Sequence, residues 1–330
     1  MNTKSQKKIL VIGGGGYVGT VLVEKLAAMN HLVRVFDLFI YGNNIINSKN
    51  IEFIRGDIRS KKDTEKIFQD IDIVYHFACI SNDPSFELNP ELSKSINYDS
   101  FMPTVKLAKD CGIKRFIYAS SSSVYGLRNE IEIREELELK PLTDYSKYKA
   151  MCEDVLIRES SKEFNVLIAR PATVCGYSKR LRLDLTVNIL TINAINKKNI
   201  QVFGGQQKRP NIHIEDMCNF YIDCIDINSE KFNNKIYNVG FENLKIIEIA
   251  NMVKNTLNIN IPITIVKSND MRSYHISSAK VKKEFGFNTV KKISDAIIEI
   301  DYASKKKLII NPLNNSDYYN INKMKELNLV

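Results

Sequence analysis

The sequence contains no apolar run that approaches the roughly 18 residues needed to cross a membrane. It begins with MNTKSQKK, a polar stretch unlike the apolar segment of a secretory signal peptide. These two absences predict no transmembrane helix, no signal peptide and no membrane partner. We therefore expect a cytoplasmic protein.

Cysteine pairs with metal-ligand spacing are also missing. The six cysteines are scattered along the chain, no two of them form a Cys-x-x-Cys motif, and most stand among apolar residues. In a cytoplasmic protein this distribution favours reduced, buried thiols over disulfides or a zinc site. We expect no bound metal.

A concentrated basic segment is absent as well, although the formal net charge is +9. Lysines are spread over the whole chain, and no short segment combines them with aromatic residues as a nucleic-acid-binding surface would. Nucleic acid is therefore not expected as a partner. An anionic small molecule remains compatible with the excess of positive charge.

What the sequence does contain is an alternation of apolar runs with helical patterns. Residues 7–38 have the pattern of a strand, a glycine turn, an amphipathic helix and a second strand, and the alternation continues to about Pro171. This order is typical of parallel sheets in α/β proteins. We predict an α/β fold, namely a Rossmann-type doubly wound parallel sheet with a smaller α+β C-terminal substrate domain.

Three glycines, Gly13, Gly16 and Gly19, follow the first predicted strand at the opening of the first predicted helix. Glycine lets the backbone turn sharply there and approach a pyrophosphate, whose charge the N–H groups of the helix N-terminus can meet. Asp37 closes the next strand, where a carboxylate binds the hydroxyls of an adenosine ribose and repels a 2′-phosphate. The pattern predicts NAD(H) as the cofactor in preference to NADP(H).

The expected domains follow from these patterns. An NAD-binding Rossmann domain is predicted over residues 1–175, and residues 176–330 are predicted to form mainly the substrate-binding domain. Part of 205–240 is expected to return to the Rossmann domain.

Tyr145 and Lys149 stand one helical turn apart in the stretch YSKYK, and therefore on one face of the predicted helix. A lysine ammonium near a phenol stabilises the phenolate and lowers a pKa that is about 10 in water. Such a tyrosine can act as a general base. The same spacing also occurs on solvated helix faces, but the glycine motif and the serine-rich stretch ASSSSVYG at residues 119–126 favour catalysis.

Together these motifs resemble those of the extended short-chain dehydrogenase/reductases, specifically the NAD-dependent sugar-nucleotide epimerase/dehydratase branch. The resemblance implies a nucleotide-diphosphate sugar as substrate and a homodimer or larger homo-oligomer. It covers nearly the whole chain and rests on motifs in the following order: GGGGYVG, Asp37, Gly56 with Asp57, HFA at residues 76–78, Asn97, the serine-rich stretch, Tyr145 with Lys149, RP at residues 170–171, and RPNIHIEDM from Arg209.

The resemblance also implies roles for individual residues. Ser121, three residues before Val124, is expected to hydrogen-bond the sugar oxygen that is oxidised, with Tyr145 and Lys149 as the other catalytic residues. His76 receives no proton-transfer role. The expected cofactor-binding residues are Gly13, Gly16, Tyr17, Val18, Asp37, Asp57, Ile58, Phe77, Ala78, Tyr145 and Lys149. The expected substrate-binding residues are Ser121, Ser122, Asn188, Val202, Arg209 and Arg272, the two arginines binding the diphosphate.

Two stretches bear on the reaction. Dehydratases of this branch carry Asp and Glu in the two positions after the catalytic hydroxyl, where this chain has Ser122 and Ser123. Serine cannot serve as that acid/base pair at neutral pH, so 4,6-dehydration is not expected. In the segment 170–188, Thr173 stands where many relatives have asparagine, and Arg180 and Arg182 add positive charge near the substrate pocket or a subunit contact.

The same segment is similar to that of enzymes acting on GDP-linked manno-configured heptoses. We therefore expect NAD-dependent oxidation of the C4 hydroxyl of a nucleotide-diphosphate sugar to the 4-keto sugar, with GDP-D-glycero-α-D-manno-heptose as the favoured substrate. The alternative is an NAD-dependent nucleotide-sugar 4-epimerase, which reduces the keto sugar again on its other face. A non-catalytic NAD-sensing or RNA-binding protein of the same fold is disfavoured because Tyr145 and Lys149 are both present.

Overall fold

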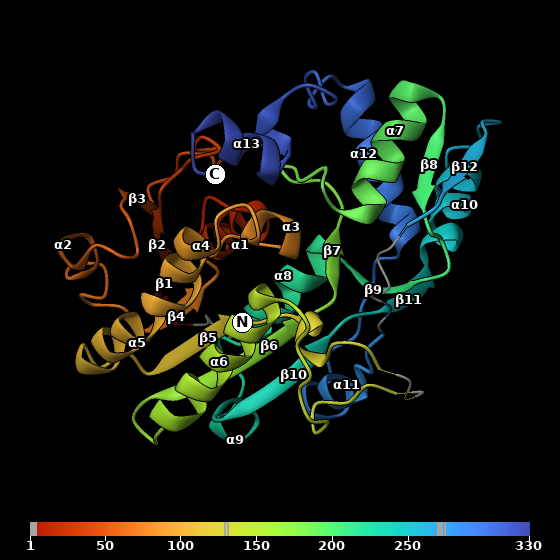
Figure 1. Ribbon diagram of the computed structural model, residues 1–330. Helices are drawn as coiled ribbons and strands as arrows, with labels where there is room; N and C mark the ends of the chain where they lie inside the picture. Colours follow the sequence, from red (N-terminus) through yellow and green to blue (C-terminus); the bar gives the residue numbers. More distant parts are fainter. Residues whose placement is uncertain (1–4, 129, 131, 269–272, 274) are drawn as a thin grey trace.

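The computed structural model describes residues 5–128, 130, 132–268, 273 and 275–330. Its centre is a parallel sheet of seven strands in the order β10-β6-β5-β4-β1-β2-β3 (Figure 1). The predicted α/β fold with a doubly wound parallel sheet is confirmed. The strands are β1 (Lys8–Ile12), β2 (Leu32–Asp37), β3 (Ile51–Arg55), β4 (Ile73–His76), β5 (Arg115–Ala119), β6 (Asn165–Pro171) and β10 (Lys235–Val239).

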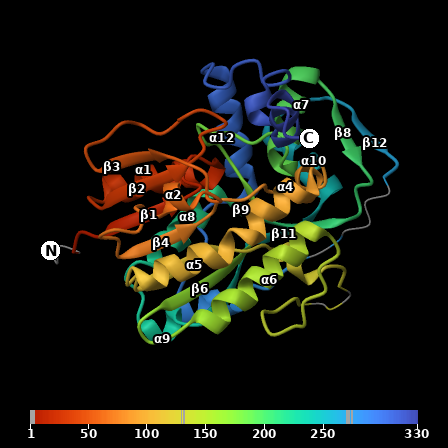
Figure 2. The same cartoon turned by 60° about the vertical axis from the view of Figure 1, so that its left-hand side comes forward.

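The central sheet is covered by helices on both faces because its strands carry apolar side chains on both sides. Along β1, Ile9 and Val11 pack into one hydrophobic cluster, and Leu10 and Ile12 pack into another. Strands that are buried on both faces have apolar residues at successive positions, and the central strands appear in the sequence as such continuous apolar runs. The covering helices are α1 (Tyr17–Ala28) and α8 (Ile214–Asp223) on the first face, and α5 (Phe101–Asp110) and α6 (Asp144–Glu159) on the second (Figure 2).

A smaller α+β portion lies beside this sheet. It contains a three-stranded sheet in the order β11-β9-β7, a parallel pair formed by β12 and β8, and a separate hydrophobic cluster between three helices and β8. Between β9 and β11 the chain returns to the central sheet, where β10 pairs with β6. The elements are β7 (Thr173–Cys175), β8 (Ile200–Phe203), β9 (Lys208–His213), β11 (Glu242–Lys245), β12 (Ile263–Val266), α7 (Thr186–Lys197), α10 (Ile246–Thr256) and α12 (Ile293–Lys305).

The remaining elements are short and lie in the connections. The last of them, α13, returns to the central part of the molecule and packs against α3. Within the described ranges, no helix is both long enough and apolar enough to cross a membrane. These elements are α2 (Lys61–Thr64), α3 (Asp83–Phe86), α4 (Pro90–Lys94), η1 (Ser95–Asp99), η2 (Ser122–Tyr125), α9 (Ser229–Phe232), α11 (Ala279–Phe285), η3 (Ser316–Tyr318) and α13 (Asn320–Glu326).

His76, at the end of β4, is part of the core. Its ring lies among the aromatic rings of Phe101, Phe116 and Tyr118, and neither ring nitrogen has a hydrogen-bond partner among the described residues. Burial, reinforced by the positive charge of Lys149, lowers the pKa of His76 from 6.5 to about 3. The imidazole is therefore neutral at pH 7 and serves as a packing group.

This buried imidazole predicts a pH dependence of stability. In the unfolded chain His76 takes up a proton near pH 6.5, whereas in the folded protein it does so only near pH 3, so its contribution is complete above pH 6.5 and is lost as the pH falls. Below the unfolded pKa, we expect this residue to add about 1.4 kcal/mol per pH unit to the fall in unfolding free energy. Urea titrations at several pH values give the unfolding free energy as a function of pH. Below pH 6.5 this free energy should fall less steeply with decreasing pH in His76→Phe, which keeps an aromatic ring, than in the wild type. Parallel slopes for the two proteins would contradict the buried neutral state.

Candidate active site

A cavity of about 430 Å³ lies at the carboxyl ends of the central strands. It spans the point between β1 and β4 where the order of the strands reverses, which is where ligands bind in open parallel sheets. Its wall includes residues that directly follow or end six of the seven strands: Gly13, Asp37, Gly56, Phe77, Ser120 and Ala172.

The first end of the cavity is formed by the glycine turn, residues 13–16, and Asp37. Gly13 has a φ of +82°, and a Cβ at this position would come within 2.4 Å of the Ala78 nitrogen, so only glycine fits. The Asp37 carboxylate accepts hydrogen bonds from the backbone N–H groups of Gly15 (3.0 Å) and Phe39 (2.7 Å). Burial raises the pKa of Asp37, and these two donors oppose the rise. The turn leaves a backbone cradle that fits a dinucleotide diphosphate.

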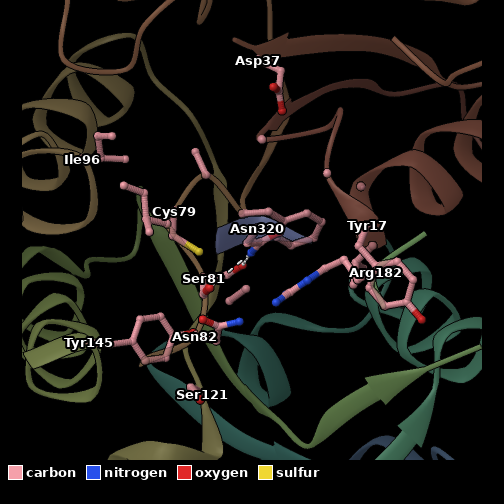
Figure 3. Close-up of a pocket in the computed structure, with 18 of the residues that line it drawn as sticks. Tyr17, Asp37, Cys79, Ser81, Asn82, Ile96, Ser121, Tyr145, Arg182 and Asn320 are labelled. Carbon is pink, nitrogen blue, oxygen red and sulfur yellow. Dashed lines mark hydrogen bonds between the residues drawn. The ribbon is translucent and has the colours of Figure 1, made fainter. Parts of the chain in front are cut away.

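The second end of the cavity holds Tyr145 and Ser121 (Figure 3). Lys149 lines the same cavity. The Ser121 hydroxyl lies near enough to the Tyr145 phenol to lower its pKa, and it lies 2.8 Å from the hydroxyl of Ser123. Lys149, one turn further along α6, donates from Nζ to the Ala119 carbonyl (2.7 Å) and lies 5.9 Å from the centre of the Tyr145 ring. The structure therefore brings the three predicted catalytic residues together.

The pKa of Tyr145 differs from the sequence-based expectation. Burial raises it well above 10, and the nearby Cys79 and Asp83 act in the same direction. Arg182 and the Ser121 hydroxyl lower it without outweighing burial. The expected depression of the phenol pKa is thus wrong for this structure, because the desolvation of a phenolate in the cavity wall exceeds the stabilisation by nearby positive charge.

A buried ion pair holds the serine-rich stretch against α6. Glu153 on α6 and Arg170 on β6 are 2.6 Å apart, and their side chains are only 2% and 3% exposed. The Ser120 hydroxyl donates to Glu153, and Arg170 Nη1 donates to the Tyr125 hydroxyl oxygen (2.8 Å). The ion pair therefore links the helix that carries Tyr145 to both ends of the loop that carries Ser121.

Removal of one partner of this ion pair is expected to be costly, because it leaves the other charge buried and unpaired. We predict that Glu153→Ala lowers the unfolding free energy by about 3–5 kcal/mol. Glu159→Ala on the same helix is the matched control, since Glu159 pairs with Lys109 in an exposed position and should change stability by about 1 kcal/mol or less. Chemical denaturation of the three proteins measures both effects. Equal losses in the two variants would show that the ion pair does not anchor the loop.

Most of the predicted site residues line this cavity. The wall includes Arg180 and Arg182 as well, which the sequence placed either near the pocket or at a subunit contact. The predicted cofactor-binding and substrate-binding residues at the wall are Gly13, Gly16, Tyr17, Val18, Asp37, Asp57, Ile58, Phe77, Ala78, Ser121, Ser122, Tyr145 and Lys149.

The other predicted substrate contacts lie elsewhere. Asn188 is fully buried, and its amide is bonded to the Tyr17 hydroxyl and to backbone groups of the loop before α7. Val202 packs in the hydrophobic cluster of the smaller portion. Both residues are internal in this structure and do not reach the cavity wall. Arg209 lies on β9 with its side chain largely buried, and Arg272 lies outside the described residues, so a diphosphate contact of either arginine stays a prediction.

The structure also adds wall residues that sequence reasoning missed. Asn320, Met324 and Leu329 come from the C-terminal segment, and Tyr41 and Asn82 come from the loops after β2 and β4. Asn320 donates from its amide to the hydroxyl of Ser81 (3.0 Å), as Figure 3 shows. No motif marks these residues, because they reach the cavity only through the path of the folded chain.

Comparison with known proteins identifies the family. The profile of the family described as "NAD dependent epimerase/dehydratase family" matches residues 9–240. The chain belongs to this family. It is therefore an NAD-dependent enzyme of the nucleotide-sugar epimerase/dehydratase type, and the glycine turn with Asp37 fits that cofactor.

Two curated relatives are similar over most of their length. The UDP-glucose 4-epimerase of Lactobacillus helveticus is 26% identical over 315 residues, which are 88% of this chain and 94% of the relative. The bifunctional UDP-glucose 4-epimerase and UDP-xylose 4-epimerase 1 of Pisum sativum is 24% identical over 321 residues, which are 86% of this chain and 91% of the relative.

Solved structures share the fold. The UDP-glucuronic acid 4-epimerase from Bacillus cereus, in complex with UDP-glucuronic acid and NAD, has a TM-score of 0.79 at 24% identity and covers 91% of this chain and 99% of its own. The dTDP-glucose 4,6-dehydratase DesIV from Streptomyces venezuelae, with NAD and TYD bound, has a TM-score of 0.83 at 20% identity. The match covers 93% of this chain and 100% of DesIV. At these identities the likeness establishes the architecture.

Proposed function

We propose that this enzyme oxidises the C4 hydroxyl of a nucleotide-diphosphate sugar. The observation that carries the proposal is that Ser121, Tyr145 and Lys149 line the same cavity as the glycine turn and Asp37, with Lys149 beside the Tyr145 ring. Such a cavity can hold a dinucleotide at one end and present an acid/base group to a sugar hydroxyl at the other.

Tyr145 and Ser121 each have a defined part in the oxidation. When bound, NAD supplies the nicotinamide ring that accepts a hydride from C4. Tyr145 takes the proton of the C4 hydroxyl on its phenolate oxygen, and Ser121 hydrogen-bonds the sugar oxygen and orients it. Arg182 and the Ser121 hydroxyl lower the pKa of Tyr145 against the effect of burial, and Lys149 places a positive charge 5.9 Å from the centre of the ring.

We propose net 4-dehydrogenation of GDP-D-glycero-α-D-manno-heptose as the reaction, with the 4-keto sugar as product. The segment 170–188 supports this choice through its similarity to enzymes acting on GDP-linked heptoses. Ser122 and Ser123, which replace the acid/base pair of a dehydratase, argue against elimination of water after the oxidation. The proposed enzyme acts in the cytoplasm as a homodimer or larger homo-oligomer.

A 4-epimerase is the second candidate, and the curated relatives favour it. Both relatives described above are named as 4-epimerases of UDP-sugars and match more than four fifths of this chain. Epimerisation begins with the same proton transfer to Tyr145 and differs only in the fate of the keto sugar, which is retained and reduced on its other face. The two candidates therefore share one site and differ in product and nucleotide.

Product analysis separates the candidates. The protein is incubated with NAD and with the GDP-heptose, GDP-mannose, UDP-glucose or UDP-N-acetylglucosamine, and each product is examined by mass spectrometry and by sugar NMR. We expect the GDP-heptose product to lose the mass of two hydrogens while NADH accumulates. An unchanged mass with an inverted C4 identifies an epimerase, and the loss of the mass of water contradicts both candidates.

The role of Tyr145 predicts the behaviour of one variant. Tyr145→Phe removes only the phenolic oxygen, so we expect the fold and NAD binding to persist while C4 oxidation slows by about 10² to 10⁴. Tyr148→Phe is the control, because Tyr148 lies on the same helix but stacks between Phe86 and Tyr98. Nicotinamide absorbance in single-turnover mixtures measures the rates. Near-normal oxidation by Tyr145→Phe would assign the proton transfer to another group.

A further inference from the structure

Arg180 is a buried cation whose residue lines the cavity and whose Nε–H group has no acceptor among the described residues. Its residue is 4% exposed, and its guanidinium lies 3.7 Å from the centre of the Tyr41 ring. Nη1 donates to the Leu181 carbonyl (3.3 Å) and Nη2 donates to Asn320 Oδ1 (2.7 Å), but Nε has no acceptor among the residues that the structure describes. A buried guanidinium with an unmet N–H group is costly unless an anion meets it.

The loop that carries Arg180 lies against the N-terminal turn of α1. The Tyr17 hydroxyl donates to the Gly176 carbonyl (2.6 Å), and the Ser178 hydroxyl donates to the Tyr17 carbonyl (3.0 Å). The charge of Arg180 is also close enough to act on the Asp37 carboxylate at the end of β2. Arg180 therefore belongs to the end of the cavity where the glycine turn and the helix N-terminus already favour an anion.

Arg182, two residues further along, is in a different electrostatic state. Its guanidinium donates to both carboxylate oxygens of Asp184, at 2.9 Å and 3.2 Å. Arg182 lowers the pKa of Tyr145, which lies at the other end of the cavity. The negative charge of Asp184 offsets part of the positive charge of Arg182. Of the two arginines, Arg180 is thus the one with a free donor and no bidentate carboxylate partner among the described residues.

We propose that Arg180 binds the diphosphate of the dinucleotide, and that Asn320 is the positioning residue that holds the guanidinium for this contact. The inference rests on the proposed function, which gives this cavity to NAD. Asn320 Oδ1 accepts from both Arg180 and the Tyr41 hydroxyl (3.1 Å), while its Nδ2 donates to Ser81. The C-terminal helix thereby joins three loops of the wall and orients the arginine.

The test compares ligands that differ by their phosphates. Isothermal titration calorimetry measures the binding of NAD, ADP, adenosine and UDP to the wild type and to Arg180→Gln. Because a charge-assisted hydrogen bond to a buried phosphate is lost, we expect ADP and NAD to bind about 10-fold to 100-fold more weakly to the variant, with adenosine unchanged. Lys179→Gln is the matched control, since it removes a neighbouring positive charge that pairs with Glu24 at the surface, and it should bind all four ligands like the wild type.

Three results would overturn the assignment. An equal loss for adenosine and ADP would give Arg180 a purely structural role, and unchanged ADP binding would remove it from the site. A loss confined to UDP would assign it to the diphosphate of the sugar substrate. If Arg180→Gln does not fold, Asn320→Ala takes its place. We expect Asn320→Ala to lose less affinity for ADP than the loss predicted for Arg180→Gln, and to bind adenosine like the wild type. Equal ADP binding by Asn320→Ala and the wild type would then reject the proposal.

Failure of the proposed function has a separate signature. If the wild type binds neither NAD nor ADP, the assignment of the cavity to the dinucleotide is wrong. If the wild type binds both and Arg180→Gln binds them equally well, only the role of Arg180 is wrong.

Discussion

The buried ion pair between Glu153 and Arg170 is the interaction on which the candidate site depends. Burial alone would lower the pKa of Arg170, but the carboxylate of Glu153 and the hydroxyl of Tyr125 raise it, so the guanidinium remains charged. Tyr125 in turn donates to Asn238 on β10 (2.7 Å). This network connects α6, β6, β10 and the serine-rich loop. The network therefore holds Tyr145 and Ser121 in place relative to each other. In the proposed reaction both must reach the same sugar oxygen, so a small shift of either side chain would slow the proton transfer.

The two ends of the cavity differ in their electrostatics. At the Asp37 end, the close-packed glycine turn and the N-terminus of α1 give the cavity a wall of backbone and a positive potential, and Arg180 adds a buried positive charge. At the Tyr145 end, the hydroxyl of Ser121 and the charge of Arg182 lower the pKa of a phenol that burial raises well above 10. A dinucleotide is long enough to connect two such ends. The fold places both on one edge of the sheet because parallel strands all end there.

The parts of the site that could be predicted are those carried by local sequence. Continuous apolar runs predicted the central strands, because strands buried on both faces need apolar side chains at successive positions. Gly13 was recognisable because it opens the glycine motif after the first strand, and the structure explains the glycine by its positive φ and the close approach of Ala78. Tyr145 and Lys149 were recognisable because helical spacing alone puts them on one face. By contrast, Asn188 was expected at the ligand and is an internal residue, since nothing in a short motif distinguishes an amide that binds a ligand from one that binds the neighbouring loop.

By itself, the sequence determined the α/β architecture, the glycine turn, the carboxylate of Asp37 and the family of the enzyme, because each of these is carried by short motifs or apolar runs that can be recognised one by one along the chain. The tertiary structure alone decided that the C-terminal helix reaches the cavity, that Asn320 meets Arg180 and Tyr41 there, and that burial raises the pKa of Tyr145. The contacts of Asn320 join residues separated by more than a hundred positions, and the pKa of Tyr145 depends on how much water the phenol loses when the chain folds. Neither the contacts nor the desolvation can be read from spacing along the chain.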